Sequence, residues 1–330
     1  MTVEVAFFSN RERRLAHVYP EASRARIGQR ANIYPTPVNS ENFAAHVAAL
    51  ANLDYIFATW GMPELTAEEI GQLAQLKAVF YGAGTVKYFA EPFLEHGVRV
   101  FSAWAANAVP VGEFTAAQII LANKQYFAAH RRMHRRESGY DLQFRGNYGG
   151  DVALLGAGMV GKEVIRRLAG YRLNILVFDP FLTEAGANEL GVTRVSLQDA
   201  FANTSIVSNH LANVPETVGL ITGDLLRSIP EGGTFINTGR GATVREPEMI
   251  EVLTERPDLT ALLDVTFPEP PAEGSALYKL DNVWLSPHIA GSLGNEVERL
   301  GDYMIEEFER VMAGEAPHYE VRPEQLATMA

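Results

Sequence analysis

The strongest constraint on the fold of this chain is the glycine-rich string Gly156-Ala157-Gly158-Met159-Val160-Gly161. An apolar run, 152–155, precedes it, and a second apolar run, 175–178, ends at Asp179. This order predicts a strand, a tight glycine turn, a helix, a second strand and an acidic residue. Such a turn lets a pyrophosphate approach the backbone, and the helix N-terminus offers it unpaired N–H groups. The string therefore predicts a parallel α/β sheet with a dinucleotide site in the middle of the chain.

A triphosphate-binding loop is the main alternative for the same glycines. It would need Ser or Thr after Lys162, but Glu163 stands there, and its carboxylate would repel a triphosphate. Asp179 lies eighteen residues after Gly161, at a spacing that suits a ribose contact and disfavours the extra phosphate of NADP. We therefore predict NAD as the cofactor. The predicted contacts around this turn are Gly156, Gly158, Met159, Val160, Gly161 and Asp179.

Composition limits the class of protein. The 330 residues suffice for two domains, and 47% hydrophobic with 21% charged residues is typical of a soluble globular chain. A net charge of −12 argues against nucleic acid as a partner, and the lack of cysteine excludes disulfides and thiolate chemistry. We see no secretory pattern at the N-terminus, and no apolar run that approaches the length of a membrane span. We expect a cytoplasmic protein with no membrane partner and no metal.

Strand-like and helix-like segments alternate along the chain, which predicts parallel sheets covered on both faces. In the first hundred residues we expect strands at 3–8, 55–58, 78–81 and 98–101, and helices within 44–50 and 67–76. From residue 151 we expect about six strands, at 152–155, 175–178, 205–208, 234–237, 259–264 and 283–285, with helices at 160–169, 197–201, 223–228 and 246–254. One long helix is expected over 107–136, and a last helix over 294–312 that returns to the first domain. The fold class is therefore α/β, with two doubly wound parallel-sheet domains and a cleft between them.

Three reactive side chains follow predicted strands of the second domain: Arg240, Glu269 and His288. Ligands of a doubly wound sheet bind at the carboxyl ends of its strands. An arginine binds a carboxylate through two parallel hydrogen bonds, and a histidine beside a carboxylate moves protons near neutral pH. With a nicotinamide to carry hydride, these groups suit interconversion of a 2-hydroxy acid and a 2-oxo acid. Asp264, at the end of its strand, is expected to accept a hydrogen bond from the nicotinamide carboxamide.

In these segments the chain closely resembles the D-isomer-specific 2-hydroxyacid dehydrogenases, over about 77–300. The shared motifs, besides the glycine string with Asp179-Pro180, are Ser208-Asn209-His210-Leu211, Pro215-Glu216-Thr217, Ile236-Asn237-Thr238-Gly239-Arg240-Gly241, Leu263-Asp264-Val265, Pro268-Glu269-Pro270 and Ser286-Pro287-His288. The resemblance implies that Arg240 orients the substrate carboxylate, His288 is the acid and base, and Glu269 stabilises its imidazolium. It adds His210, Thr217, Thr238, Arg240, Asp264 and His288 to the cofactor contacts.

The resemblance also implies a domain arrangement and a partner. A Rossmann-type NAD-binding domain would occupy 102–292, and a flavodoxin-like substrate domain would combine 1–101 with 293–330. Members of this family are usually homodimers joined through the cofactor domain. We therefore expect a small-molecule substrate and a second copy of the chain as partners, and no nucleic acid.

The chain departs from the family in its substrate loop. Where the family has Gly-x-Asp-Asn, this chain has Gly82-Ala83-Gly84-Thr85 running into Val86-Lys87-Tyr88. The N–H groups of Ala83, Gly84 and Thr85, together with Arg240 and His288, are predicted to bind the substrate. Phosphoglycerate dehydrogenases carry an arginine just before the loop, but Val79-Phe80-Tyr81 stands here, so a phosphorylated substrate is not expected. Tyr81, Tyr88 and Trp104 either shape a pocket for a bulkier side chain or pack the domain hinge.

Two other functions fit the same fold. Formate dehydrogenases resemble this chain but place glutamine where Glu269 stands, which argues against that activity. An NAD(H)-sensing transcriptional corepressor would keep the fold and all three reactive residues, and only the acidic composition disfavours it.

On the helix over 107–136, His130 and His134 have metal-ligand spacing, but the four arginines around them oppose a cation. We interpret that basic cluster as a solvated helix face or a dimer contact. The sequence leaves the natural substrate open.

Overall fold

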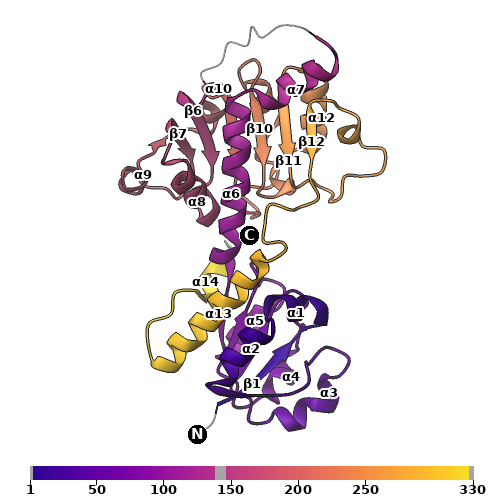
Figure 1. The fold of residues 1–330 in the computed structure, drawn as a ribbon, viewed down its shortest axis with the longest axis vertical. Helices are drawn as coiled ribbons and strands as arrows, with labels where there is room; N and C mark the ends of the chain where they lie inside the picture. Colours follow the sequence, from indigo (N-terminus) through magenta and orange to yellow (C-terminus); the bar gives the residue numbers. More distant parts are fainter. Residues whose placement is uncertain (1–2, 138–145, 327–330) are drawn as a thin grey trace. The chain divides into compact units, whose positions relative to one another are not determined.

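The computed structural model describes residues 3–137 and 146–326 (Figure 1). These residues form two compact units. One contains the described residues up to Asn107 and from Ser292 onward, and the other contains Ala108–Gly291. Each unit is built on a sheet of mainly parallel strands with helices on both faces, so the predicted α/β class with two doubly wound sheets is confirmed.

Among the described residues, the first unit has a six-stranded sheet in the order β13-β5-β4-β3-β1-β2. All neighbours are parallel except β13, which runs antiparallel to β5. The order 2-1-3-4-5 of its parallel strands is the flavodoxin-like arrangement. The strands are β1 (Val3–Phe8), β2 (Ala31–Ile33), β3 (Tyr55–Ala58), β4 (Ala78–Tyr81), β5 (Arg99–Ser102) and β13 (Glu320–Val321). The helices are α1 (Glu12–Val18), α2 (Glu21–Gly28), α3 (Phe43–His46), η1 (Val47–Leu50), α4 (Ala67–Gly71), α5 (Ala90–Glu95), α13 (Glu296–Ala313) and α14 (Pro323–Leu326).

In its described residues, the second unit has a seven-stranded, fully parallel sheet in the order β12-β11-β10-β9-β6-β7-β8. The chain builds outward from β6 in one direction, then returns to add β9 on the other side of β6. This reversal creates the switch point at which doubly wound sheets bind ligands. The strands are β6 (Tyr148–Leu155), β7 (Arg172–Phe178), β8 (Thr193–Arg194), β9 (Ile206–Asn209), β10 (Thr234–Asn237), β11 (Thr260–Leu263) and β12 (Val283–Leu285). The helices are α7 (Tyr126–His134), α8 (Met159–Leu168), α9 (Glu184–Leu190), α10 (Leu197–Ala202), α11 (Gly223–Arg227), η2 (Gly241–Thr243), α12 (Glu246–Glu255) and η3 (Ala276–Tyr278), and α6 (Trp104–Asn123) enters this unit from the first.

The inner strands read as continuous apolar runs because both faces of each sheet are covered. In the first unit β3 and β4 are buried at every residue, and apolar side chains form a separate cluster on each face. The second sheet likewise has one apolar cluster on each face. This burial holds the strand ends, and therefore the loops that follow them, in place.

Several expected elements differ from the structure. The expected helix over 107–136 is two helices, because Gln125 adopts a left-handed conformation (φ 54°) between α6 and α7. The short strands β2 and β8 and the helix α9 were not expected. Both strands lie at sheet edges and have only three and two residues, which are too few to stand out as a strand-like run. The second sheet therefore has seven strands rather than six.

Helix α6 corrects a further expectation. By length and composition it is apolar enough to cross a membrane, contrary to the expectation that no apolar run has this length. However, 56% of the qualifying stretch is buried inside the structure. Its buried residues Ile119 and Ala122 pack in the core of the second unit.

Candidate active site

The glycines of the turn after β6 have two different roles. Gly156 has a positive φ of 99°, and a Cβ there would lie 2.9 Å from the carbonyl oxygen of His210. A Cβ on Gly161 would lie 2.1 Å from the carbonyl oxygen of Gly156. At Gly158, by contrast, a Cβ would meet no atom within 4 Å. The fold itself requires the outer two glycines, whereas Gly158 leaves an open cradle for a ligand.

Hydrogen-bond donors converge on this cradle. Helix α8 begins at Met159 with no side-chain cap, and in the described residues the N–H groups of Met159 and Val160 have no acceptor. Such a helix start binds anions. Asp179 spans the turn, since its Oδ2 accepts from Ala157 N at 2.7 Å and its Oδ1 from Phe181 N at 2.7 Å. Each carboxylate oxygen keeps a second lone pair for a ribose hydroxyl. These residues fit a dinucleotide.

His210, after β9, is held as a neutral imidazole. Burial lowers its pKa to about 3. Its Nε2 lies 3.0 Å from Ser208 Oγ and its Nδ1 lies 3.3 Å from Thr238 Oγ1, which in turn lies 2.9 Å from Thr115 Oγ1 on α6. A neutral ring in a network of hydroxyls is suited to packing and hydrogen bonding, and not to proton transfer at neutral pH.

Thr217 has a local role in the structure. Its hydroxyl donates to Ala212 O at 2.5 Å and accepts from Val214 N at 3.1 Å. It therefore closes its own turn, after β9. A contact with the cofactor would have to come in addition to these bonds.

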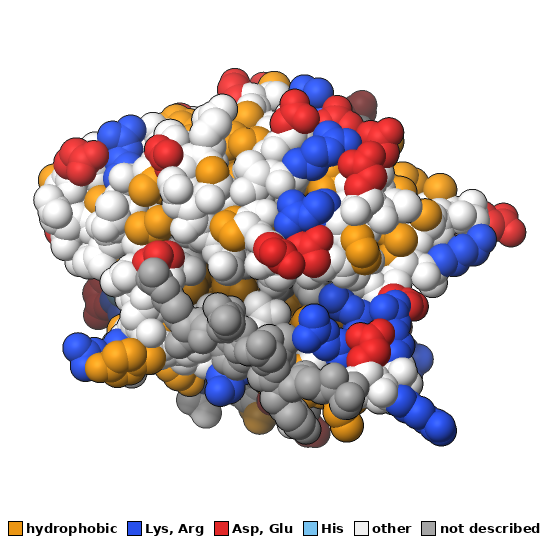
Figure 2. Space-filling view, turned by 90° about the horizontal axis from the view of Figure 1, so that it is seen from above, with side chains coloured by type: hydrophobic (Ala, Val, Ile, Leu, Met, Phe, Trp, Pro, Cys, Tyr) orange, Lys and Arg blue, Asp and Glu red, His pale blue; other side chains and the backbone are white. Residues whose placement is uncertain are grey.

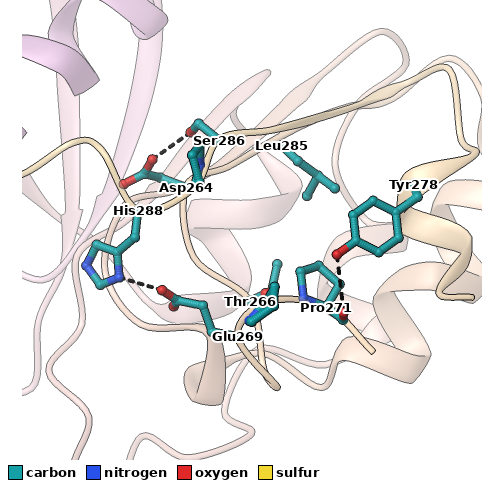
Figure 3. A pocket seen from close by; sticks show the side chains of 10 residues that line it. Asp264, Thr266, Glu269, Pro271, Tyr278, Leu285, Ser286 and His288 are labelled. Atoms are coloured by element: carbon teal, nitrogen blue, oxygen red, sulfur yellow. Dashed lines mark hydrogen bonds and ion pairs between the residues drawn. The ribbon is translucent and has the colours of Figure 1, made fainter. Parts of the chain in front are cut away.

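Asp264, after β11, holds the segment that carries His288. It is only 2% exposed, and its carboxylate accepts from Ser286 Oγ at 2.6 Å, Ile289 N at 2.9 Å and Ala290 N at 2.9 Å. Figure 3 shows the bond between Asp264 and Ser286. Sequence reasoning missed this role, because it needs the parallel pairing of β11 with β12. One lone pair of Oδ2 stays available to a ligand.

His288 and Glu269 form a pair. Nδ1 of His288 lies 2.7 Å from Oε1 of Glu269, and both side chains are partly exposed (Figure 3). His288 is itself left-handed (φ 54°), and its backbone N–H donates to Asp264 O at 3.0 Å. Its Nε2 has no partner among the described residues, so it is available to a reacting group. The pair lines a pocket of about 360 Å³ beside Tyr278 and Leu285.

Arg240, after β10, is half-buried, and its Nη1 donates to Gly239 O at 2.8 Å. Burial lowers the pKa of this guanidinium, and the charge of Glu269 partly opposes the effect. Within the described part of the chain, Arg240 has no carboxylate within 4 Å. A poorly solvated cation without an ion-pair partner is suited to bind an anionic substrate.

Glu246, at the start of α12, is a residue that sequence reasoning missed. It is 8% exposed, and its Oε2 accepts from Phe267 N at 2.9 Å, two residues before Glu269. The same loop approaches the Arg240 turn so closely that a Cβ on Gly241 would lie 2.0 Å from Thr266 O. Burial raises the pKa of the Glu246 carboxyl. Its place in the sequence, in a polar helix start, gave no signal of this contact.

The predicted substrate loop lies in the first unit, after β4. Ala83 N donates to Tyr81 O at 2.8 Å, so this N–H is not free, contrary to expectation. Ser102 Oγ donates to Ala83 O at 2.9 Å and to Gly84 O at 2.5 Å. The N–H groups of Gly84 and Thr85 have no acceptor in the described residues. The loop therefore offers two free donors rather than three.

The aromatic residues near this loop are mainly packed. Tyr81 is 1% exposed, and its hydroxyl lies 3.2 Å from that of Tyr88, which is 41% exposed. Trp104 packs edge-on against Tyr319 within the first unit. Of the three, Tyr88 has the most exposed surface for a ligand.

Comparison with known proteins agrees with this geometry. The model of the D-isomer specific 2-hydroxyacid dehydrogenase NAD binding domain matches residues 116–290, which is more than half of the chain and lies in the second unit. A D-3-phosphoglycerate dehydrogenase of Mycobacterium tuberculosis is 30% identical over 252 residues, covering 76% of this chain and 47% of that protein. The chain thus spans about half the length of the curated relatives it matches.

Solved structures share the fold. A phosphoglycerate oxidoreductase from Rhizobium etli has a TM-score of 0.81 at 22% identity, over 97% of this chain and 98% of that one. A D-lactate dehydrogenase from Treponema pallidum has a TM-score of 0.72 at 19% identity, over 97% and 100%. At these identities the likeness supports the fold alone.

Proposed function

The chain belongs to the D-isomer specific 2-hydroxyacid dehydrogenase family, and from this premise we propose that it interconverts a small 2-oxo acid and its D-2-hydroxy acid. The observation that carries the proposal is the 2.7 Å pair of His288 and Glu269, beside a desolvated Arg240, at one edge of the NAD-binding sheet. NAD(H) is the cofactor. Its pyrophosphate would bind the N–H groups of Met159 and Val160, and its ribose would bind Asp179.

The bound cofactor supplies or accepts the hydride. Arg240 binds the substrate carboxylate through its guanidinium and polarises the neighbouring carbonyl. His288 donates a proton from Nε2 to the developing alkoxide during reduction, and takes it back during oxidation. Glu269 accepts a hydrogen bond from Nδ1–H, so Nε2 faces the substrate and the imidazolium is stabilised. His210, Thr217, Thr238 and Asp264 are proposed to lie along the nicotinamide half of the cofactor.

The first unit is proposed to bind the substrate. The free N–H groups of Gly84 and Thr85 are the donors in this unit that are proposed to bind the substrate. Because Val79-Phe80-Tyr81 lacks an arginine, the proposed substrate is unphosphorylated, whereas the named relatives above include phosphoglycerate enzymes. We also propose a substrate domain formed by 1–101 with 293–330, and an NAD-binding domain formed by 102–292. The protein is further proposed to be a homodimer joined through the cofactor domain, and to be cytoplasmic.

The test is the loss of NADH absorbance with a panel of 2-oxo acids: glyoxylate, hydroxypyruvate, pyruvate, branched and aromatic analogues, and 3-phosphohydroxypyruvate. We expect turnover with at least one unphosphorylated acid and production of the D-isomer only. A preference for the phosphorylated acid would overturn the substrate class. Comparable efficiency with NADPH would remove Asp179 from its role in cofactor choice.

Two other functions have distinct outcomes in the same assay. Formate oxidation would appear as NAD reduction with formate, and Glu269 is the residue that argues against it. A corepressor would bind NADH tightly without turning over any acid in the panel. If none of the acids is turned over, the dehydrogenase proposal is contradicted.

A further inference from the structure

A second hollow lies in the second unit at the amino ends of β11 and β12, the opposite sheet edge from His288. It has a volume of about 260 Å³. Arg131 lines it from α7, Arg135 from the C-cap of that helix, and Lys279 and Asp281 from the segment before β12. The lining contains three cations and one carboxylate, in a chain whose net charge is −12. Seen from above, Figure 2 shows Lys and Arg side chains interspersed with Asp and Glu side chains. The hollow is therefore locally basic on an acidic protein.

The positive charges in this hollow are only partly compensated. Asp281 Oδ2 lies 2.5 Å from Arg135 Nη2, and both side chains are more than half exposed, so the pair is weak. In the residues that the structure describes, neither Arg131 nor Lys279 has a carboxylate within 4 Å. Three cations thus face one anion.

Arg131 is the most constrained of these cations. It is half-buried, and its Nη1 donates to the buried hydroxyl of Thr260 at 3.0 Å. Burial lowers the pKa of its guanidinium and the positive charge of Arg135 adds to the effect, while the carboxylates of Asp281 and Asp258 partly oppose it. A guanidinium has five N–H donors, so most of its donors stay open to a ligand. A bound anion would offset both the desolvation and the repulsion.

The neutral polar groups of the lining are already used. Thr254 Oγ1 donates to Ile250 O at 2.7 Å, and Asn282 Nδ2 donates to Leu253 O at 2.9 Å. The donors left for a ligand are therefore the cations. Their guanidinium forks match the oxygen pairs of phosphates and carboxylates. The volume is below the range of about 300–1,000 Å³ of drug-sized ligand sites, which favours a small ligand.

We propose that this hollow binds a small oxyanion, a phosphate or carboxylate group, through Arg131, Arg135 and Lys279. This site is distinct from the cofactor cradle at Gly158 and from Arg240, because it lies at the other end of the strands. Thr260 opens β11, and Asn282 immediately precedes β12. The anion would therefore contact the two strands whose far ends carry Asp264 and His288.

The experiment uses the full chain saturated with NADH, so that the cofactor cradle is occupied. Thermal unfolding and isothermal titration calorimetry compare inorganic phosphate, citrate and sodium chloride at equal ionic strength. We expect phosphate or citrate to raise Tm beyond the chloride control, and the stronger of the two identifies the chemistry of the ligand. Arg131→Gln should raise the Kd by about tenfold, the loss expected for one charge-assisted hydrogen-bonded contact.

Arg132→Gln is the matched control, since it removes the same charge from the next residue of α7, an exposed side chain that does not line the hollow. The Arg132→Gln protein should show the same rise in Tm and the same Kd for the anion as wild type. Lys279→Gln tests the hollow from a different segment and should also weaken binding. The proposal is overturned if wild-type protein shows no response beyond chloride. It is also overturned if the Arg131→Gln and Lys279→Gln proteins bind the anion with the wild-type Kd. The same holds if Arg132→Gln weakens anion binding as much as Arg131→Gln does.

Discussion

Nδ1 of His288 lies 2.7 Å from Oε1 of Glu269, although nineteen residues separate them in the chain. Their loops follow β12 and β11, which are neighbouring parallel strands with Leu263 paired to Leu285. The bond directs Nε2 of His288 away from Glu269, so one ring nitrogen is held and the other is free to exchange a proton. This pairing turns two ordinary loop residues into an acid–base unit.

The first prediction concerns that unit. His288→Gln should lower kcat by about 10²–10⁴-fold, the usual contribution of a general acid–base group, with NADH affinity within error of wild type. Stopped-flow reduction of a 2-oxo acid and NADH fluorescence titration measure the two effects. Tyr278→Phe is the control, because its hydroxyl lines the same pocket but donates only to Pro271 O. A His288→Gln enzyme with near-normal kcat would exclude His288 from the chemistry.

The second prediction separates two glycines of one turn. Gly161→Ala should lower the free energy of unfolding by about 1–3 kcal/mol, because its Cβ would overlap the carbonyl of Gly156. Gly158→Ala should leave stability nearly unchanged and weaken NADH binding, because its Cβ would enter open space where the cofactor is proposed to lie. Urea unfolding and NADH titration of both variants measure this. Unchanged NADH affinity in Gly158→Ala would contradict the cradle.

The third prediction concerns Glu246. Glu246→Ala leaves the N–H of Phe267 without its acceptor, so we expect a loss of stability of about 1–3 kcal/mol and a lower kcat with unchanged NADH affinity. Glu246→Gln keeps an acceptor and should restore most of the kcat. Glu248→Ala is the control, since Glu248 accepts from Gly223 N at the start of α11 and should affect stability alone. Equal kcat in the Glu246→Ala and Glu248→Ala enzymes would show that Glu246 does not position Glu269.

The fourth prediction is a pH dependence of stability. His210 stays neutral in the folded protein down to pH of about 3, whereas in the unfolded chain it takes up a proton below about pH 6.5. Unfolding therefore becomes easier as pH falls between these values, by at most about 1.4 kcal/mol per pH unit from this residue. His210→Gln should remove this part of the slope, measured by urea unfolding from pH 7 to pH 4. The exposed His96, changed to Gln, controls for the loss of one histidine, and an unchanged slope in His210→Gln would refute the burial effect.

Much of the architecture could be predicted from local patterns. The buried strands β3, β4 and β10 were expected with their observed bounds because all their residues are apolar or pack inward. Edge strands β2 and β8 could not be predicted, since three and two residues are too few to leave a pattern. The break at Gln125 was missed because neither Gly nor Pro stands at 124–127, so only the backbone conformation marks the end of one helix and the start of the next.

For the site, local sequence patterns were enough to identify the candidate reactive residues. The glycine turn, Asp179 and the reactive residues Arg240, Glu269 and His288 are legible because each follows a strand and carries a distinctive side chain. Which of these groups are in contact, and which residues hold them, is seen only in the folded chain. Asp264 binds the His288 segment, Glu246 binds the loop of Glu269, and the N–H of Ala83 is already used. The first two are contacts between segments more than twenty residues apart, and they depend on strand register and burial, which no local pattern encodes. The bond from Ala83 N to Tyr81 O is local, and it depends on the backbone conformation of the loop.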